Sequence, residues 1–294
     1  MRRLTLLTNP DKCNLRCPLC FLNQRDRPFG MGEMPFEVAK VAIDRYFENL
    51  REVIPSTMGE PLLYSKFADL LDYCSARKIP LNLTTNGTFP GNWRTPAGME
   101  RLLRACSDIK ISCMAFDEEG FAEMMPGATF TQWRGNVERL LEVARLFQDD
   151  AVSERKVATV SLQVTLHRKL LPFATEILAW AESVGIARIK WNLPVFISAG
   201  ESLRKEYGVD LATVRELREI LKSERARCEG NLFFAGKQGL HDMPDSGQCD
   251  FFRDEIWILP DGTEERCPNP ERRFGDGASA GATCEKCLLF NQDL

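Results

Sequence analysis

The residues most able to do chemistry in this chain are three cysteines near its N-terminus. Cys13, Cys17 and Cys20 are spaced C-x3-C-x2-C. Clustered thiolates bind soft metals, either as zinc sites or as iron–sulfur clusters. A zinc site or an electron-transfer cluster usually takes four protein ligands, but the next Cys or His after this run is Cys74. Three ligands on a four-iron cluster would leave one iron open for chemistry.

A second group of cysteines lies toward the C-terminus. Cys249 and Cys267 flank the segment Ile256–Gly262, whose pattern predicts a hairpin arm and its turn. A hairpin would bring Cys267 back toward Cys249, and Cys284 and Cys287 could then complete a four-thiolate cage. The alternative is a structural zinc ribbon. Eleven cysteines in a chain without a predicted signal peptide favour metal binding over disulfides.

Length and composition bound the class of protein. The chain has 294 residues, 44% of them hydrophobic, which allows one large α/β domain and a small appendage. No apolar run is long enough to cross a membrane. The net charge of −4 gives no reason to expect nucleic acid and suits a cationic substrate. We therefore expect a cytoplasmic protein with neither a membrane nor a nucleic-acid partner.

Short β-rich runs alternate six times with longer amphipathic segments, which implies a parallel sheet with right-handed crossovers. We expect an α/β fold, a partial (β/α)6 barrel over residues 1–225 whose functional face lies at the C-terminal strand ends. Beyond residue 224 Cys, Gly, Asp and Pro become dense, so residues 226–294 are expected to form a small iron–sulfur domain. The expected strands are 3–7, 52–56, 81–85, 108–112, 159–165 and 188–192, and the expected helices are 35–49, 67–77, 99–105, 131–147, 172–184 and 211–224.

The spacing of the first three cysteines resembles the signature of radical S-adenosylmethionine (SAM) enzymes. The resemblance implies a [4Fe-4S] cluster on Cys13, Cys17 and Cys20 whose open iron binds SAM. The run Met58–Pro61, after the second expected strand, resembles the family's Gly-Gly-Glu-Pro segment, with Met in place of the first Gly. It implies that Gly59, Glu60 and Pro61 surround the SAM amino group, because Gly permits close approach and a carboxylate accepts from an ammonium.

Further SAM contacts are implied at other strand ends. Asn86 lies in a Thr-Asn-Gly run after the third strand, Ser112 ends the fourth strand, and Leu19 resembles the family's apolar position beside the adenine. Gln163 and Thr165 alternate on one face of the fifth strand. They either line the barrel as SAM or substrate ligands or form an outward-facing polar stripe.

The C-terminal cysteines resemble the auxiliary-cluster domains of this family, called SPASM or, when shortened, Twitch. The resemblance implies a second [4Fe-4S] cluster. Its ligands would be Cys267, Cys284 and Cys287, with either Cys228 or Cys249 as the fourth.

Size and cysteine layout are similar to those of radical SAM epimerases that act on aminoglycosides. Such an enzyme inverts a sugar carbon by hydrogen abstraction and hydrogen return from a thiol, so it needs a free cysteine. Cys249 is the preferred donor. A thiolate bound to iron carries no hydrogen, so if Cys249 is a cluster ligand, Cys113 or Cys228 would be the donor instead. The expected partners are a cationic aminoglycoside and an electron donor such as flavodoxin or ferredoxin.

Three other functions stay open. One is a radical SAM dehydrogenase that oxidises an aminocyclitol or a sugar alcohol. Another is a peptide-modifying maturase, although the short segment before Cys13 leads us to expect a small-molecule substrate. The last is an iron–sulfur electron carrier that never cleaves SAM, against which the Gly59-Glu60-Pro61 run argues.

Overall fold

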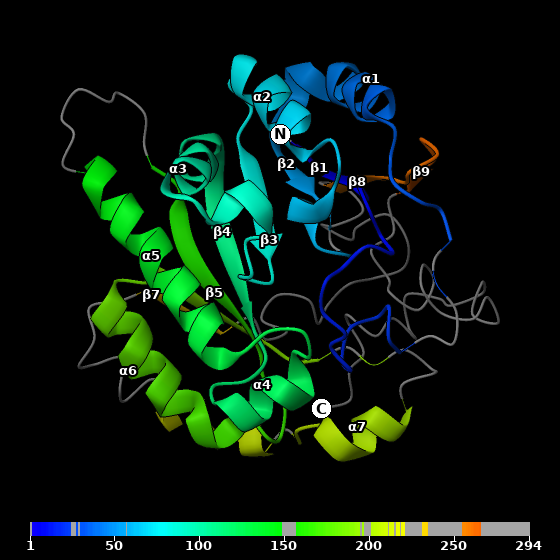
Figure 1. The fold of residues 1–294 in the computed structure, drawn as a ribbon. Coiled ribbons are helices and arrows are strands. Elements are labelled where there is room, and N and C mark those ends of the chain that lie inside the picture. The colour runs from blue at the N-terminus through cyan, green and yellow to red at the C-terminus, as the bar shows by residue number, and fades with distance from the viewer. Residues whose placement is uncertain are drawn as a thin grey trace.

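One curled sheet organises the molecule (Figure 1). The computed structural model describes residues 2–24, 28, 30–56, 58–148, 157–194, 196, 201–210, 212–214, 216–217, 219–220, 231–234 and 255–265. In this part of the chain, nine strands pair in the order β7-β6-β5-β4-β3-β2-β1-β8-β9. All neighbours are parallel except β8 and β9. The expected α/β fold with a parallel sheet is therefore confirmed.

The six expected strands are all present, and their ends differ from the expected ones by no more than two residues. β3, β5 and β6 have the expected bounds. The strands are β1 Arg2–Leu6, β2 Leu50–Pro55, β3 Leu81–Thr85, β4 Cys106–Cys113, β5 Thr159–Thr165, β6 Arg188–Asn192, β7 Asn231–Phe234, β8 Glu255–Ile258 and β9 Glu264–Glu265.

Helices cover the outer face of the sheet and connect successive strands (Figure 1). Two of them were not expected from the sequence, α4 and α7, and both are only seven residues long. The described residues within the expected helix 211–224 are helical. The helices are α1 Phe36–Tyr46, α2 Phe67–Ala76, α3 Pro96–Ala105, α4 Glu118–Met124, α5 Phe130–Gln148, α6 Ala174–Val184 and α7 Glu201–Tyr207, with short 3₁₀ turns η1 Phe47–Asn49, η2 Pro61–Leu63, η3 Gly91–Arg94 and η4 Leu171–Phe173.

Local signals explain where several helices begin and end. The Thr95 hydroxyl accepts from the Gly98 N–H, and Pro96 follows it at the first helical position of α3. The Asp117 carboxylate accepts from the Gly120 N–H at the start of α4. Helix α6 ends where Gly185 takes a φ of 80°. Asp117 thus serves as the N-cap of α4.

The hydrophobic core lies between the outer face of the sheet and these helices. Because side chains alternate along a strand, every second residue faces the helices. In β4 these are Ile109, Ile111 and Cys113, and in β5 they include Leu162 and Val164, all with no exposed surface.

The opposite face of the central strands is polar. Strand register places Lys110 beside Ser161, and Ser112 beside Gln163. It also places Gln163 beside Lys190, and Thr165 beside Asn192. Gln163 and Thr165 therefore lie on the face away from the helices, which decides between the two orientations that the sequence left open.

This polar face is concave. Burial lowers the pKa of Lys190 on β6, and the charge of Arg3 on β1 lowers it further. These two residues therefore lie close together. The two strands are five places apart in the sheet order, which would be about 24 Å in a flat sheet. Screening would remove an interaction over that distance. The sheet must therefore curl into a partial barrel, in which β7 and β9 are the edge strands of the described part.

Strands beyond residue 225 extend this sheet at both edges. β7 pairs with β6, and β8 pairs with β1. The expected hairpin is present, since β8 and β9 are antiparallel and the turn between them contains Gly262 with a φ of 88°. The division at residues 225 and 226 stays a prediction.

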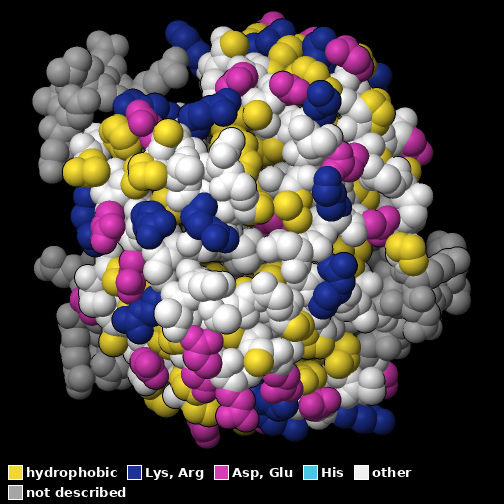
Figure 2. Space-filling model, viewed as in Figure 1, with side chains coloured by type: hydrophobic (Ala, Val, Ile, Leu, Met, Phe, Trp, Pro, Cys, Tyr) yellow, Lys and Arg dark blue, Asp and Glu magenta, His cyan; other side chains and the backbone are white. Residues whose placement is uncertain are grey.

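The surface over the helices mixes charges of both signs (Figure 2). Basic and acidic side chains are interspersed over most of the face that is shown. No helix in the described part of the chain is long and apolar enough to span a bilayer.

Candidate functional site

The loop that carries the three cysteines follows β1 and lies at the C-terminal edge of the sheet. Its backbone is bound to the loop after β2 and to the turn between α4 and α5. The Glu60 N–H donates to the Lys12 carbonyl oxygen at 2.9 Å, and the Arg16 N–H donates to the Pro126 carbonyl oxygen at 3.1 Å. The cysteines are thus held at the end of the barrel where such folds place their chemistry.

Asn9 and Gly59 join the cysteine loop to the loop after β2. The Asn9 side-chain amide donates to the carbonyl oxygens of Lys12, at 3.1 Å, and Glu60, at 2.7 Å. The Thr8 hydroxyl donates to the Asn9 side-chain oxygen at 2.7 Å, which fixes the amide orientation. Gly59 has a φ of 74°, and its α-carbon packs against the backbone of Asn9 and Lys12. The glycine expected to approach SAM is in close backbone contact with this loop.

Glu60 is almost fully buried, and its carboxylate accepts three hydrogen bonds from the protein. The donors are the Thr85 hydroxyl at 2.7 Å, the Asn86 N–H at 2.8 Å and the Leu62 N–H at 3.3 Å. Burial raises the pKa of Glu60 to about 7, against the opposing effect of these donors. Pro61 begins η2 directly after it. The carboxylate therefore ties the ends of β2 and β3 together, and its contact with a SAM ammonium stays a prediction.

Asn86 links the end of β3 to the first cluster cysteine. Its side-chain N–H donates to the Asn14 side-chain oxygen at 2.9 Å and lies 3.8 Å from the Cys13 sulfur. Its side-chain oxygen accepts from the Thr88 N–H and hydroxyl, at 3.0 and 2.7 Å. Asn86, expected as a SAM contact, thus lies beside the loop of the three cysteines.

The three thiols fit the donor set of an iron–sulfur cluster. Burial raises the pKa of all three, that of Cys20 to about 11, and mutual repulsion between the thiolates raises the pKa of Cys17 further. The sulfurs are therefore neighbours. Within the described residues, no three Cys, His, Asp or Glu side chains converge on a single ion position. A four-iron cluster does not need such convergence, because each thiolate binds a different iron.

The remaining expected SAM contacts are dispersed around this edge. Ser112 and Gln163 are half-buried neighbours on the concave face, and Thr165 lies one step nearer the strand ends. Leu19 is buried within the cysteine loop, where its carbonyl accepts from the Gln24 amide at 2.9 Å.

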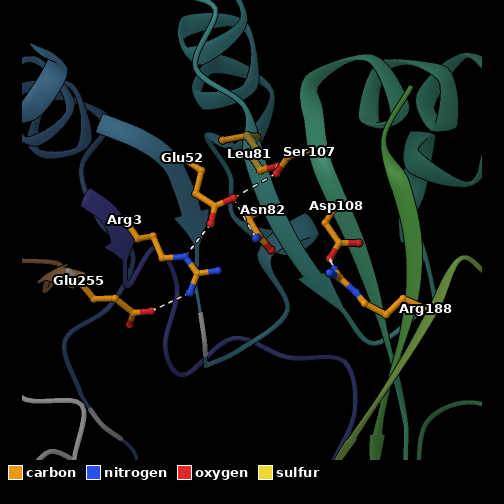
Figure 3. Close-up of polar contacts among 8 residues, drawn as sticks. All are labelled: Arg3, Glu52, Leu81, Asn82, Ser107, Asp108, Arg188 and Glu255. Atoms are coloured by element: carbon orange, nitrogen blue, oxygen red, sulfur yellow. Dashed lines mark hydrogen bonds and ion pairs between the residues drawn. The ribbon is translucent and has the colours of Figure 1, made fainter. Parts of the chain in front are cut away.

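Charged side chains occupy the other end of the concave face (Figure 3). Arg3 donates to Glu52 at 2.7 Å and to Glu255 at 3.1 Å. Arg188 forms an ion pair with Asp108 from two strands away. These contacts join β8, β1 and β2 on one side and β4 and β6 on the other.

Several expected site residues lie elsewhere or cannot be placed. Cys113 is fully buried on the helix-facing side of β4, and its thiol donates to the Ala115 carbonyl oxygen at 3.4 Å. The structure does not bring it together with the cluster cysteines. The cysteines expected in the auxiliary cluster and as hydrogen donor, Cys228, Cys249, Cys267, Cys284 and Cys287, lie outside the described residues.

The sequence reasoning missed four residues that the structure places at or near the site: Asn9 and Asn14 in the loop, and Lys110 and Lys190 on the concave face. Period-two alternation of polar and apolar residues in 108–112 and 188–192 could have identified the two lysines. Asn9 and Asn14 carry no such signal, because the contacts that join them to other loops, Asn9 with Glu60 and Asn14 with Asn86, involve residues distant in sequence.

Residues 10–146 match the family model described as the Radical SAM superfamily. This segment, just under half of the chain, holds the three cysteines, Glu60 and Asn86. The match implies SAM and one [4Fe-4S] cluster as cofactors.

Two curated proteins give a broader comparison. The chain is 25% identical over 209 residues to the AdoMet-dependent heme synthase of Oleidesulfovibrio alaskensis, which covers 71% of this chain and 49% of that protein. It is 29% identical over 79 residues to the tungsten-containing aldehyde ferredoxin oxidoreductase cofactor-modifying protein of Pyrococcus furiosus, which covers 26% and 22%. The chain spans about half the length of the first relative and about a fifth of the second.

Solved structures share the fold. Streptococcus suis SuiB bound to S-adenosylmethionine superposes with a TM-score of 0.66 at 17% identity, over 91% of this chain and 60% of that chain. Native anSMEcpe with bound AdoMet superposes with a TM-score of 0.62 at 14% identity, over 90% and 74%. At such identities the similarity concerns the fold alone.

Proposed function

We propose that this chain, whose residues 10–146 match the Radical SAM superfamily model, is an enzyme that cleaves SAM and modifies a substrate on the concave face of its sheet. One observation carries the proposal. The loop of Cys13, Cys17 and Cys20 is bound to the ends of β2 and β3 through Glu60 and Asn86, the two positions that the family's SAM-binding motifs select.

The residues of the chain have separate tasks in this proposal. A reduced [4Fe-4S] cluster with bound SAM supplies a 5′-deoxyadenosyl radical. Cys13, Cys17 and Cys20 would hold the cluster, and the Asn86 amide and the Leu15 N–H, 3.4 Å from the Cys13 sulfur, would donate to that thiolate. Gly59 and Glu60 hold the loop in place, and the half-buried Ser112 and Gln163 line the face on which SAM and substrate would meet.

The test is production of 5′-deoxyadenosine by anaerobically reconstituted, chemically reduced protein. Replacing Cys13, Cys17 and Cys20 together by Ala should abolish it and remove about four irons. The matched control is Cys74→Ala, which removes a buried thiol of α2 that belongs to neither cysteine group. Cluster-loaded wild-type protein that binds SAM but never cleaves it would favour an electron carrier instead.

For the finer reaction we propose epimerisation of the neomycin C type, with hydrogen return from Cys249. The support is the cysteine layout of the sequence, together with the inward-facing polar strand ends. In deuterated water, inverted product should carry one deuterium at the inverted carbon, because thiol protons exchange with solvent. Oxidised product without deuterium would support the dehydrogenase in its place.

The second cluster is likewise a proposal. Wild-type protein should hold about eight irons if Cys267, Cys284 and Cys287 bind a [4Fe-4S] cluster. Replacing these three by Ala should leave about four. Stoichiometric zinc in anaerobically purified protein would instead support a structural zinc ribbon.

A further inference from the structure

Two lysines on the concave face have no hydrogen-bond or ion-pair partner in the described part of the chain. They are Lys110 on β4 and Lys190 on β6, with β5 between them. Lys110 is half-buried. Lys190 is open to solvent yet has protein on several sides, since burial lowers its pKa. Both lysines therefore lie on the concave face of the curled sheet.

The carboxylates whose charges act on these lysines are Glu52, Asp108 and Glu255. Figure 3 shows that each of them is already engaged by another group. Glu52 accepts from Arg3 and from the Asn82 amide at 3.0 Å. Asp108 forms its ion pair with Arg188 and accepts from the Ser161 hydroxyl at 2.7 Å. The third carboxylate, Glu255, is paired with Arg3.

Two ammonium groups without close counter-ions are costly in such surroundings. Burial lowers the pKa of Lys110 to about 8; the Asp108 charge opposes this lowering, and the charge of Lys190 adds to it. Burial also lowers the pKa of Lys190, with further lowering by the charges of Arg3 and Arg188. A bound anion would relieve this repulsion and supply the missing acceptors.

The two lysines are also well placed relative to the strand ends. Lys190 is in register with Gln163, and Gln163 is in register with Ser112. Lys110 lies two residues before Ser112, about 7 Å deeper along the strand. An anion held between the lysines would leave the rest of a molecule pointing toward the edge where the cysteine loop lies.

We propose that Lys110 and Lys190 bind an oxyanion of the substrate, a carboxylate or a phosphate group, on the concave face of the sheet. The inference rests on the proposed cleavage of SAM, because it names the substrate class of the same site, and it is an alternative to the proposed neomycin C substrate. It also opposes the expectation of a purely cationic aminoglycoside, whose ammonium groups would meet two like charges here.

The experiment measures binding of two probes, succinate and inorganic phosphate, to reconstituted, SAM-loaded protein by calorimetry. Lys110→Met and Lys190→Met should each weaken binding of at least one probe by roughly tenfold or more, the effect of losing one charge-assisted hydrogen bond. Lys110→Arg should retain most of the affinity. The matched control is Lys205→Met, which removes an exposed ammonium on α7. Whichever probe the lysines select identifies the oxyanion as carboxylate or phosphate.

A second measurement locates the probe. Acetylation of lysines by acetic anhydride, followed peptide by peptide by mass spectrometry, should slow several-fold at Lys110 and Lys190 when the probe is bound. Acetylation of Lys205 should not change. Equal protection of all three lysines, or unchanged probe affinity in both Met variants, would overturn the inference.

The lysines could bind the carboxylate of SAM instead of an oxyanion of the substrate. The SAM affinity of the lysine variants distinguishes these two ligands. If the lysines serve the substrate, Lys110→Met and Lys190→Met should bind SAM with the wild-type affinity. A tenfold loss of SAM affinity in either variant would assign the lysines to SAM and reject the inference. Failure of the wild-type protein to cleave SAM, with probe binding intact, would reject only the proposed function.

Discussion

A Cβ on Gly59 would lie 2.2 Å from the carbonyl oxygen of Asn9, so the loop after β2 and the loop that leads into the cysteines touch backbone to backbone. The same two loops share the hydrogen bonds of the Asn9 amide. The position of the cysteines therefore depends on the absence of a side chain at residue 59.

Gly59→Ala should destabilise the protein and loosen the cysteine loop. The new Cβ would clash with the Asn9 and Lys12 carbonyl oxygens, and a φ of 74° costs a non-glycine residue about 1–2 kcal/mol by itself. Urea unfolding and iron retention after reconstitution measure the two effects. Gly91→Ala is the matched control, because Gly91 has a φ of 60° but no atom within 4 Å of its Cβ position. Equal effects of the two substitutions would mean that backbone strain alone is responsible.

Glu60→Ala should destabilise the SAM-free protein, because it leaves three buried donors without their acceptor. Unsatisfied donors cost roughly 1–3 kcal/mol each, so a total loss of at least about 3 kcal/mol is expected. Urea unfolding without SAM measures this, and SAM titration of the folded variant measures the expected ligand contact. A variant as stable as wild type but weak in SAM binding would assign Glu60 to the ligand alone.

Glu60 should also contribute a pH dependence. Its pKa is about 7 in the folded protein and 4.5 in the reference state, so the folded state holds the extra proton between these values. Stability relative to Glu60→Gln should be highest below pH 4.5 and should fall as pH rises through 7, by on the order of 1–3 kcal/mol. Urea unfolding of both proteins across this range measures the difference, and parallel curves would contradict the raised pKa.

Lys110→Met should stabilise the unliganded protein at pH 7. The pKa of Lys110 is about 8 when folded and 10.5 in the reference state, so the folded protein binds fewer protons between these values and gains stability as pH rises through them. Removing the ammonium should therefore add on the order of 1–3 kcal/mol at pH 7 and little above pH 10.5. Lys205→Met should be neutral at both pH values in the same unfolding experiment.

Arg3→Met should be destabilising, because it leaves two buried carboxylates, Glu52 and Glu255, without their cation. The Arg3 side chain is 35% exposed, which reduces the loss to about 1–3 kcal/mol. Arg51→Met is the control, since Arg51 is exposed on β2 next to Glu52. Similar urea midpoints for the two variants would show that the Arg3 contacts contribute nothing.

The sequence by itself determined the local features of this protein. The C-x3-C-x2-C spacing identified the candidate cluster-binding loop, because its three thiols lie within one short segment. Period-two and helical patterns predicted six strands, since alternation and amphipathicity are local consequences of which face is buried. They did not predict α4 or α7, whose seven residues are too few for a periodic signal.

Tertiary structure decided which distant residues meet. Register between parallel strands put Gln163 beside Lys190, and curling of the sheet brought the charges of β1 and β6 together. The contact of Gly59 with Asn9 and that of Asn86 with Cys13 join residues 50 or more positions apart, so no local pattern encodes them. The charge that the concave face presents to a substrate therefore depends on how the strands pair and curl, because only those contacts settle which charged groups neutralise one another.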